Sequence, residues 1–145
     1  MRFFVGGNAV NAFTPASYAH SVEFHADDAF AGNETEFLVK FHWGNGHYYG
    51  STINLNGHSQ RLGTLRSSVA QPRDATLSPF EVTPTGNSRI TSDGPATLFV
   101  NQTADGVIIV PFMGQAALAK GGPATLVMSN TTHTATAPLA VTGGT

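Results

Sequence analysis

The sequence contains no cysteine, and only 11% of its 145 residues are charged. The absence of cysteine excludes a disulfide scaffold and thiolate metal sites. Soluble domains average about 25% charged residues, so uncharged polar side chains or partner subunits must cover much of this surface. The net charge of −2 gives no overall field that would attract nucleic acid or an anionic membrane.

Long apolar segments are missing as well. No apolar run approaches the ~18 residues that a membrane-spanning helix needs. The run Phe3–Val5 is too short for the core of a signal peptide, and two glycines follow it. We therefore expect a soluble protein, located in a virion or otherwise in the cytoplasm.

Recognised catalytic motifs are absent too. There is no nucleophile elbow, no phosphate-binding glycine loop and no catalytic dyad in a motif context. The adjacent carboxylates Asp27 and Asp28 fall in an expected loop, where a solvated turn is the simpler interpretation. His25, His42 and His47 are the best metal candidates among six histidines, but their spacing matches no metal motif. We predict no catalytic residues, no metal and no cofactor.

Threonine, glycine, phenylalanine and proline are abundant, at 17, 16, 10 and 8 residues. Threonine and phenylalanine favour strands, whereas glycine and proline occupy turns. The composition therefore predicts an all-β chain, specifically an antiparallel β-sandwich or jelly-roll-like single domain over residues 1–145. We expect helical turns at most, at Ala16–Ala19 and Gln115–Lys120.

The clearest local pattern lies in residues 36–55. Large apolar residues occupy every second position from Phe37 to Trp43, which is the period of a strand. The residues Gly44-Asn45-Gly46 that follow tolerate the positive φ angles of a tight hairpin loop. The pattern therefore predicts a β-hairpin.

Two registers of this hairpin are open. A two-residue loop pairs Trp43 with Tyr48, whereas a three-residue loop pairs Trp43 with His47 and Phe37 with Ile53. We favour the three-residue loop, because it stacks apolar residues along one face. A second turn at Asn56-Gly57 would then return residues 58–66 as a third antiparallel strand.

Two further patterns each leave two interpretations open. Gly94–Thr103 and Gly122–Thr131 share the word Gly-Pro-Ala-Thr-Leu, through duplication or through convergence of strand entries. Five acids lie in residues 23–36, and four arginines lie between residues 61 and 89. These two stretches either form complementary patches for neighbouring subunits or neutralise each other within one domain.

Together these features favour a structural, non-enzymatic subunit of a homo-oligomeric assembly. A virus capsid decoration (cement) protein or another virion protein would fit this class. Its partners would be copies of itself and a larger protein shell, without nucleic acid or membrane. Extended arms at residues 1–13 and 131–145 would make the contacts, through Phe3, Phe4, Pro138, Leu139 and Val141.

The alternative is a carbohydrate-binding β-sandwich module. Trp43 and Tyr48 crowd one end of the expected hairpin, next to the amide of Asn45. Aromatic faces combined with amide groups suit sugar rings, which present C–H patches and hydroxyls together. In this interpretation a glycan would bind at the hairpin end.

Overall fold

Strands make up all of the regular secondary structure in the described chain. The computed structural model describes residues 2–5, 20–29, 36–44, 47–49, 51–70, 76–77, 88–129 and 132–145. The expectation of a strand-built chain is confirmed within these ranges, and none of them contains a helix that could cross a membrane. The expected antiparallel sandwich or jelly roll is wrong, because strands that stack on one another pair in parallel.

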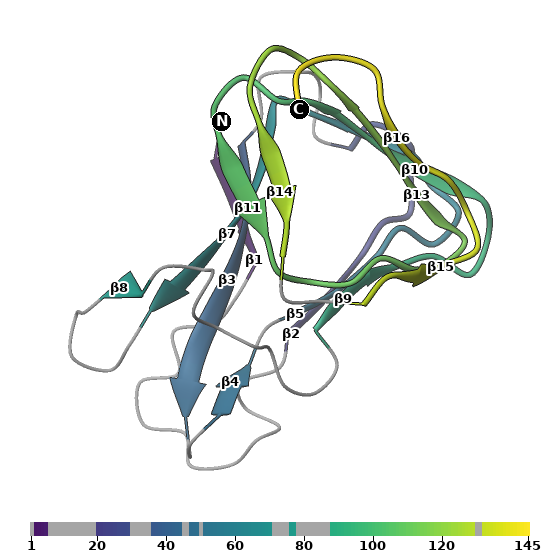
Figure 1. Ribbon diagram of the computed structural model, residues 1–145. Helices are drawn as coiled ribbons and strands as arrows, with labels where there is room; N and C mark the ends of the chain where they lie inside the picture. The colour runs from purple at the N-terminus through teal and green to yellow at the C-terminus, as the bar shows by residue number, and fades with distance from the viewer. Residues whose placement is uncertain are drawn as a thin grey trace.

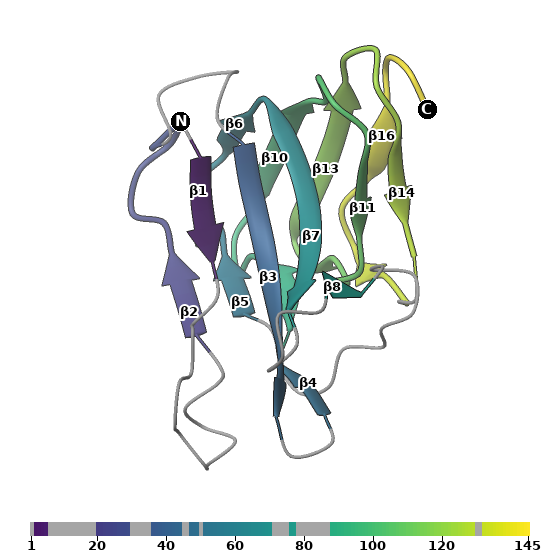
Figure 2. The same ribbon diagram turned by 90° about the vertical axis from the view of Figure 1, so that its left-hand side faces the viewer.

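The chain winds over three faces in turn, and one passage over the three faces is called a coil below (Figure 1). The first face holds β1 (Arg2–Val5), β3 (Glu36–Gly44), β7 (Thr64–Ala70), β11 (Gly106–Ile108) and β14 (Leu126–Met128), side by side in Figure 2. The second face holds β2 (His20–Glu23), β5 (Ser51–Asn54), β9 (Arg89–Thr91), β12 (Met113–Gly114) and β15 (Thr134–Ala135). The third face holds β6 (Gln60–Leu62), β10 (Ala96–Asn101), β13 (Ala116–Gly121) and β16 (Leu139–Val141). The architecture is a β-solenoid.

This winding explains the parallel pairing. Parallel neighbours in a sheet need a long crossover connection, and here the other two faces of each coil supply it. Antiparallel pairing among the described strands joins β3 to β4 (His47–Tyr49) and β7 to β8 (Thr76–Leu77). In the last coils Gly106 pairs with Leu126 and Leu118 pairs with Leu139, so a coil takes 20 or 21 residues.

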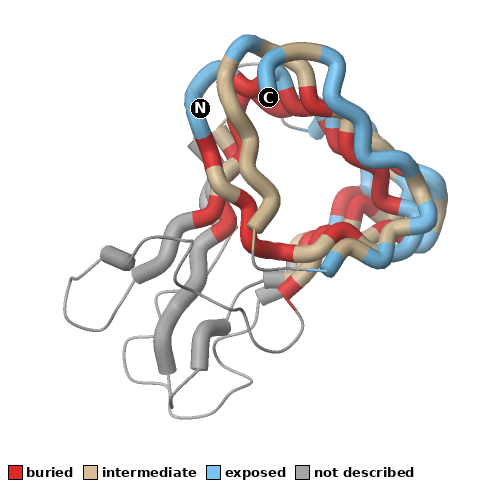
Figure 3. Tube along the Cα trace, in the orientation of Figure 1, coloured by how far each residue is buried: buried red, intermediate tan, exposed pale blue. Residues whose placement is uncertain are grey.

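The core consists of equivalent side chains stacked from coil to coil. Leu98 and Leu118 are in register and buried, and so are Ile53 and Ile90 on the second face. Figure 3 shows the buried positions of the described chain along the strands. Full burial of a large apolar side chain stabilises the fold by about 1.5–3 kcal/mol, so these stacks are the main source of stability.

A glutamine side chain helps to join β7 to the following coil. Gln102 is fully buried, and its amide accepts a hydrogen bond from Leu65 N and donates to Leu65 O, both at 3.1 Å. The side chain therefore imitates a neighbouring strand, because it satisfies both polar groups of the Leu65 backbone. Ser67 Oγ accepts from Ile109 N at 3.2 Å and closes the same seam.

Two predictions about the centre of the chain need correction. The hairpin has the two-residue loop, since Trp43 pairs with Tyr48 and not with His47. Phe37 pairs in parallel with Phe3 and Leu65 instead of Ile53. Asn56-Gly57 does form a turn, with φ angles of 52° and 77°. Residues 58–66 then continue over other faces as β6 and the start of β7, because the turn is a corner of the coil.

The second half departs from expectation in two places. The helical turn predicted at Gln115–Lys120 is the strand β13, while the one at Ala16–Ala19 lies outside the described residues. The two Gly-Pro-Ala-Thr-Leu words do not occupy equivalent places. The first leads into β10 on the third face and the second into β14 on the first face. The words therefore do not mark the structural repeat, and convergence explains them.

Candidate functional site

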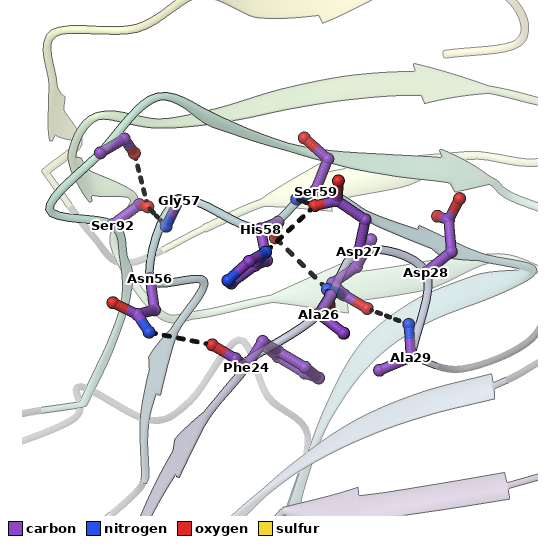
Figure 4. A network of polar contacts seen from close by, with 12 residues as sticks. Phe24, Ala26, Asp27, Asp28, Ala29, Asn56, Gly57, His58, Ser59 and Ser92 are labelled. Atoms are coloured by element: carbon purple, nitrogen blue, oxygen red, sulfur yellow. Dashed lines mark hydrogen bonds and ion pairs between the residues drawn. The ribbon is translucent and has the colours of Figure 1, made fainter.

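The adjacent carboxylates Asp27 and Asp28 lie at a polar corner of the solenoid (Figure 4). Asp27 Oδ1 accepts a hydrogen bond from Ser59 N at 2.8 Å, and Asp28 N donates to Ser59 O at 2.9 Å. His58 Nδ1 lies 3.4 Å from Asp27 Oδ1, but their side chains are 36% and 69% exposed. The Ser59 hydroxyl is itself engaged, because it accepts from Thr97 N at 3.0 Å. This arrangement holds two coils together.

Two amide side chains complete the same corner. Gln60 is fully buried; its Oε1 accepts from Ala29 N at 2.9 Å and its Nε2 donates to Ala26 O at 2.8 Å. Asn56 Nδ2 donates to Phe24 O at 3.1 Å, as Figure 4 shows. A buried polar group left without a partner costs about 1–3 kcal/mol, so these bonds make the corner a specific joint between coils.

The three metal candidates lie after β2 (His25), in β3 (His42) and in β4 (His47). His25 Nε2 contacts Glu23 Oε1 at 3.4 Å, and both side chains are open to water, at 76% and 48%. The hairpin register places His42 opposite Tyr49 and His47 opposite Gly44. Across the described residues no group of three His, Cys, Asp or Glu side chains is arranged to hold a metal ion.

The proposed sugar-binding residues belong to the hairpin of β3 and β4. Trp43 and Tyr48 are cross-strand partners there, and Asn45 lies outside the described residues. Figures 1 and 2 show this hairpin extending beyond the three faces of the solenoid.

The acidic and arginine-rich stretches meet inside the chain. Asp28 pairs with Arg61, and Glu36 pairs with Arg66, each pair joining one coil to the next. For these four residues, the acidic and basic side chains neutralise each other within one chain, which is the second of the two interpretations. Such pairs are worth about 0–1 kcal/mol when solvent-exposed, so they contribute little to overall stability.

The C-terminal end of the solenoid has a different character. From Gly106 to Thr145 the only charged residue is Lys120, and its side chain is 1% exposed. Lys120 Nζ donates to Gly143 O at 2.5 Å and to Gly122 O at 3.2 Å. The ammonium group is therefore held inside by backbone carbonyls, and the carboxylate of Asp105, just before this segment, accepts from Thr125 N at 2.8 Å.

Apolar side chains that face the core elsewhere are open to solvent at this end. Leu139 is in register with the buried Leu118, and Val141 with the buried Lys120, yet they are 41% and 64% exposed. No strand in the described chain pairs with the outer edges of β14, β15 and β16. We call this surface the terminal surface; it comprises Leu126, Met128, Ala135, Leu139 and Val141.

The predicted contact residues divide between the two ends of the solenoid. Leu139 and Val141 belong to the terminal surface, and the neighbouring Pro138 is exposed while its carbonyl accepts from Leu118 N at 3.1 Å. Phe3 and Phe4 lie in β1 at the opposite end (Figure 2). Within the chain, residues 134–145 form β15, β16 and the segment after them, paired along the last coils. Their contact with another subunit stays a prediction.

The structure has a hollow on the third face that the sequence patterns did not predict. It has a volume of about 320 Å³ and is lined by Arg61, Phe99, Val100, Asn101, Ala119, Gly121 and Thr142. The Arg61 guanidinium lies 5.2 Å from the centre of the Phe99 ring, which is 38% exposed. Residues from β6, β10 and β13 and the residue after β16 converge here only because the coils align them, so no local sequence pattern marks the hollow.

The terminal surface is thus the feature of the described chain that most resembles a contact site. It combines exposed apolar side chains with outer strands that contain no charged residue and that no described strand pairs with on their outer side. Such features mark protein–protein interaction sites in general. Comparison of this chain with protein-family models, with curated proteins and with solved structures found no match in any of the three.

Proposed function

We propose that this protein is a structural, non-enzymatic subunit of a homo-oligomeric assembly, and that copies associate through the terminal surface. A capsid decoration protein or another virion component is the class of assembly proposed, with copies of the chain and a larger protein shell as partners. The low charge content supports this class, because a covered surface needs few charges to stay in solution.

The single observation that carries the proposal is the exposure of Leu139 and Val141. Both occupy positions whose equivalents in the preceding coil, Leu118 and Lys120, are buried. A subunit placed against β16 would bury both side chains as a further coil would. Each would then contribute up to about 1.5–3 kcal/mol to association.

The open edges support the same conclusion. Monomeric β proteins protect edge strands with charged residues, proline or a covering segment, because free N–H and C=O groups invite pairing with another chain. The outer strands β14, β15 and β16 contain no charged residue. Part of the outer side of β14 is covered, because Leu126 N donates to Thr145 O at 2.8 Å. No strand in the described chain pairs with the outer edge of β16, so this edge is the one proposed to associate.

Charge introduced at the terminal surface tests the proposal. We expect Leu139→Asp and Val141→Asp each to raise the dissociation constant of the assembly roughly 100-fold or more, because an unpaired carboxylate would be buried. Light scattering at several protein concentrations measures the change. The control is Asn101→Asp, which adds the same charge at an exposed position of β10. A wild-type chain that is monomeric at every concentration would contradict the proposal.

Carbohydrate binding remains the second candidate, because the hairpin extends beyond the solenoid and carries Trp43 opposite Tyr48. Trp43→Ala is expected to abolish retention on a glycan array while the circular dichroism spectrum and the melting temperature stay unchanged. A variant that unfolds would identify Trp43 as a packing residue. A folded variant that binds the same glycans as the wild type would remove Trp43 from the site.

A further inference from the structure

The turn Asn56-Gly57 contains the pair of residues in which spontaneous deamidation is least hindered. Glycine has no side chain, so its backbone nitrogen can approach the side chain of the preceding asparagine closely. We infer that Asn56 is a self-modification site controlled by the joint between neighbouring coils. Its amide is stable while the joint is closed and is lost once the joint opens.

The reaction uses only atoms of this chain and water. The Gly57 nitrogen gives up its proton and attacks Cγ of Asn56, so that a new N–C bond forms. The bond from Cγ to Nδ2 breaks, and Nδ2 takes up a proton and leaves as ammonia. Water then opens the succinimide ring at either carbonyl and leaves aspartate or isoaspartate, with no oxidant or reductant. The reaction therefore needs a released Gly57 N–H and an Asn56 amide that is free to turn towards it.

The structure engages both of these groups elsewhere. Gly57 N donates a hydrogen bond to Ser92 Oγ at 2.9 Å, and Asn56 Nδ2 donates to Phe24 O at 3.1 Å. Figure 4 shows the two bonds leading to different partners, of which Ser92 follows β9 and Phe24 follows β2. The attacking nitrogen and the amide under attack are therefore held by two different coils, one on each side of the turn.

The partners of the turn are themselves fixed. Ser92 is 1% exposed, and its hydroxyl donates to Gly94 O at 2.6 Å, which leaves its oxygen to accept from Gly57 N. On the other side of the turn, Asn56 N donates to Asn54 Oδ1 at 2.9 Å. Deamidation thus requires a local opening of this corner, as hydrogen exchange of a protected amide does.

The product cannot rebuild the joint. A carboxylate has no N–H donor, so it would place an acceptor against Phe24 O where Asn56 Nδ2 now donates. Isoaspartate also adds a carbon atom to the backbone of the turn, which His58 N closes by donating to Leu55 O at 2.7 Å. A single opening event therefore leaves a permanent change, and a modified chain opens more readily than an intact one.

Peptide mass spectrometry after incubation in mildly alkaline buffer measures the rate of deamidation at Asn56. We expect the folded wild-type chain to react at least roughly tenfold more slowly than the chain in urea, because two hydrogen bonds must break first. The sequence supplies a reference for the unfolded rate, since Asn45 and Asn56 both stand in the word Asn-Gly-His and should react alike in urea. Equal rates for Asn56 in the folded and unfolded chains would overturn the inference.

The substitution Ser92→Ala removes the acceptor of Gly57 N and should speed deamidation of the folded chain about three- to tenfold. The matched control is Ser59→Ala at the same corner, which removes a hydroxyl that accepts from Thr97 N and leaves the bond from Gly57 to Ser92 in place. Its rate should stay within about twofold of the wild-type rate. An unchanged rate in Ser92→Ala, or the same acceleration in both variants, would contradict control by this bond.

Hydrogen exchange of the wild-type chain provides a second test that does not depend on the folding of Ser92→Ala. Deamidation needs the same Gly57 N–H to be released, so this amide should exchange at least roughly tenfold more slowly in the folded chain than in urea, after correction for the intrinsic rate. A Gly57 amide that exchanges as fast as in the unfolded chain would show that Ser92 does not protect the turn, and the inference would be wrong.

Discussion

The first and last coils of this solenoid are built from the same type of strand, but they are held together differently. The early coils are joined by side chains, including the ion pairs Asp28–Arg61 and Glu36–Arg66 and the buried amide of Gln60. The last two coils are joined largely by backbone hydrogen bonds, for example from Leu118 N to Pro138 O and from Thr142 N to Lys120 O. From Gly106 onward the only charged side chain in the sequence is that of Lys120, and it is buried.

This difference shows how one fold can give its two ends different behaviour. Coil stacking needs only apolar inward positions and tight corners, so the outward residues and the edges are free to vary. Charges on the early coils keep water at that end, whereas the terminal surface offers open edges and apolar side chains. We therefore expect changes in backbone geometry to affect the last coils most, and changes in charge to affect the first coils.

The largest effect is expected for Gly122→Ala. Gly122 has a φ angle of +78°, and a Cβ atom there would lie 2.5 Å from Gln102 O and 2.7 Å from Gln102 N. The backbone strain and the clash together should lower the free energy of unfolding by about 3 kcal/mol or more. The control is Gly57→Ala, whose φ is +77° but whose nearest neighbour would lie 4.0 Å away; about 1 kcal/mol is expected. Urea denaturation measures the free energy of unfolding of both variants. Equal losses of this free energy would show that the contact of the added Cβ with Gln102 does not affect stability.

A smaller effect is expected for Asp28→Asn in the early coils. The variant removes the ion pair between Asp28 and Arg61, whose side chains are 39% and 49% exposed, respectively. We expect a loss of about 0.5 kcal/mol at low salt that disappears near 1 M salt, where the screening length is only ~3 Å. The matched change Asp105→Asn removes a carboxylate near the last coils while keeping an oxygen that can accept from Thr125 N. Its stability should not depend on salt; the same salt dependence in both variants would point to a general charge effect.

The smallest effect is expected from His133, which lies between β14 and β15. Its Nδ1 accepts a hydrogen bond from Phe112 N at 3.1 Å, and burial lowers the pKa of the ring below 6.5. A folded-state pKa below the unfolded value means that the unfolded chain binds more protons. The contribution to stability is therefore complete above pH 6.5 and falls as the pH drops through 6.5 towards the folded-state pKa.

The substitution His133→Asn tests this pH dependence, because asparagine offers an acceptor oxygen but does not titrate in this range. The difference in unfolding free energy between wild type and variant should shrink or reverse on acidification from pH 7.5 to pH 5. A difference that is constant over this range would show that His133 contributes nothing to the acid sensitivity of the last coils.

Part of this picture could be predicted from local patterns. The alternation from Phe37 to Trp43, the short strand Arg2–Val5 and the turn at Asn56-Gly57 are all present. The repeat of the solenoid was not predicted, although Leu98, Leu118 and Leu139 stand 20 and 21 residues apart. Longer connections in the early coils hide this period, because Glu36 pairs with Thr64 and Thr52 with Arg89.

The sequence by itself determined that the chain is built from strands, where several of its turns lie, and that the segment after Gly106 is almost free of charge. The tertiary structure alone decided that the strands run parallel, that the acids of one coil meet the arginines of the next, and that Lys120 is enclosed while Leu139 and Val141 are exposed. The physical reason is that alternation fixes which face a side chain takes but is the same for parallel and antiparallel neighbours. The choice between them depends on contacts between residues one coil apart, which no local pattern contains.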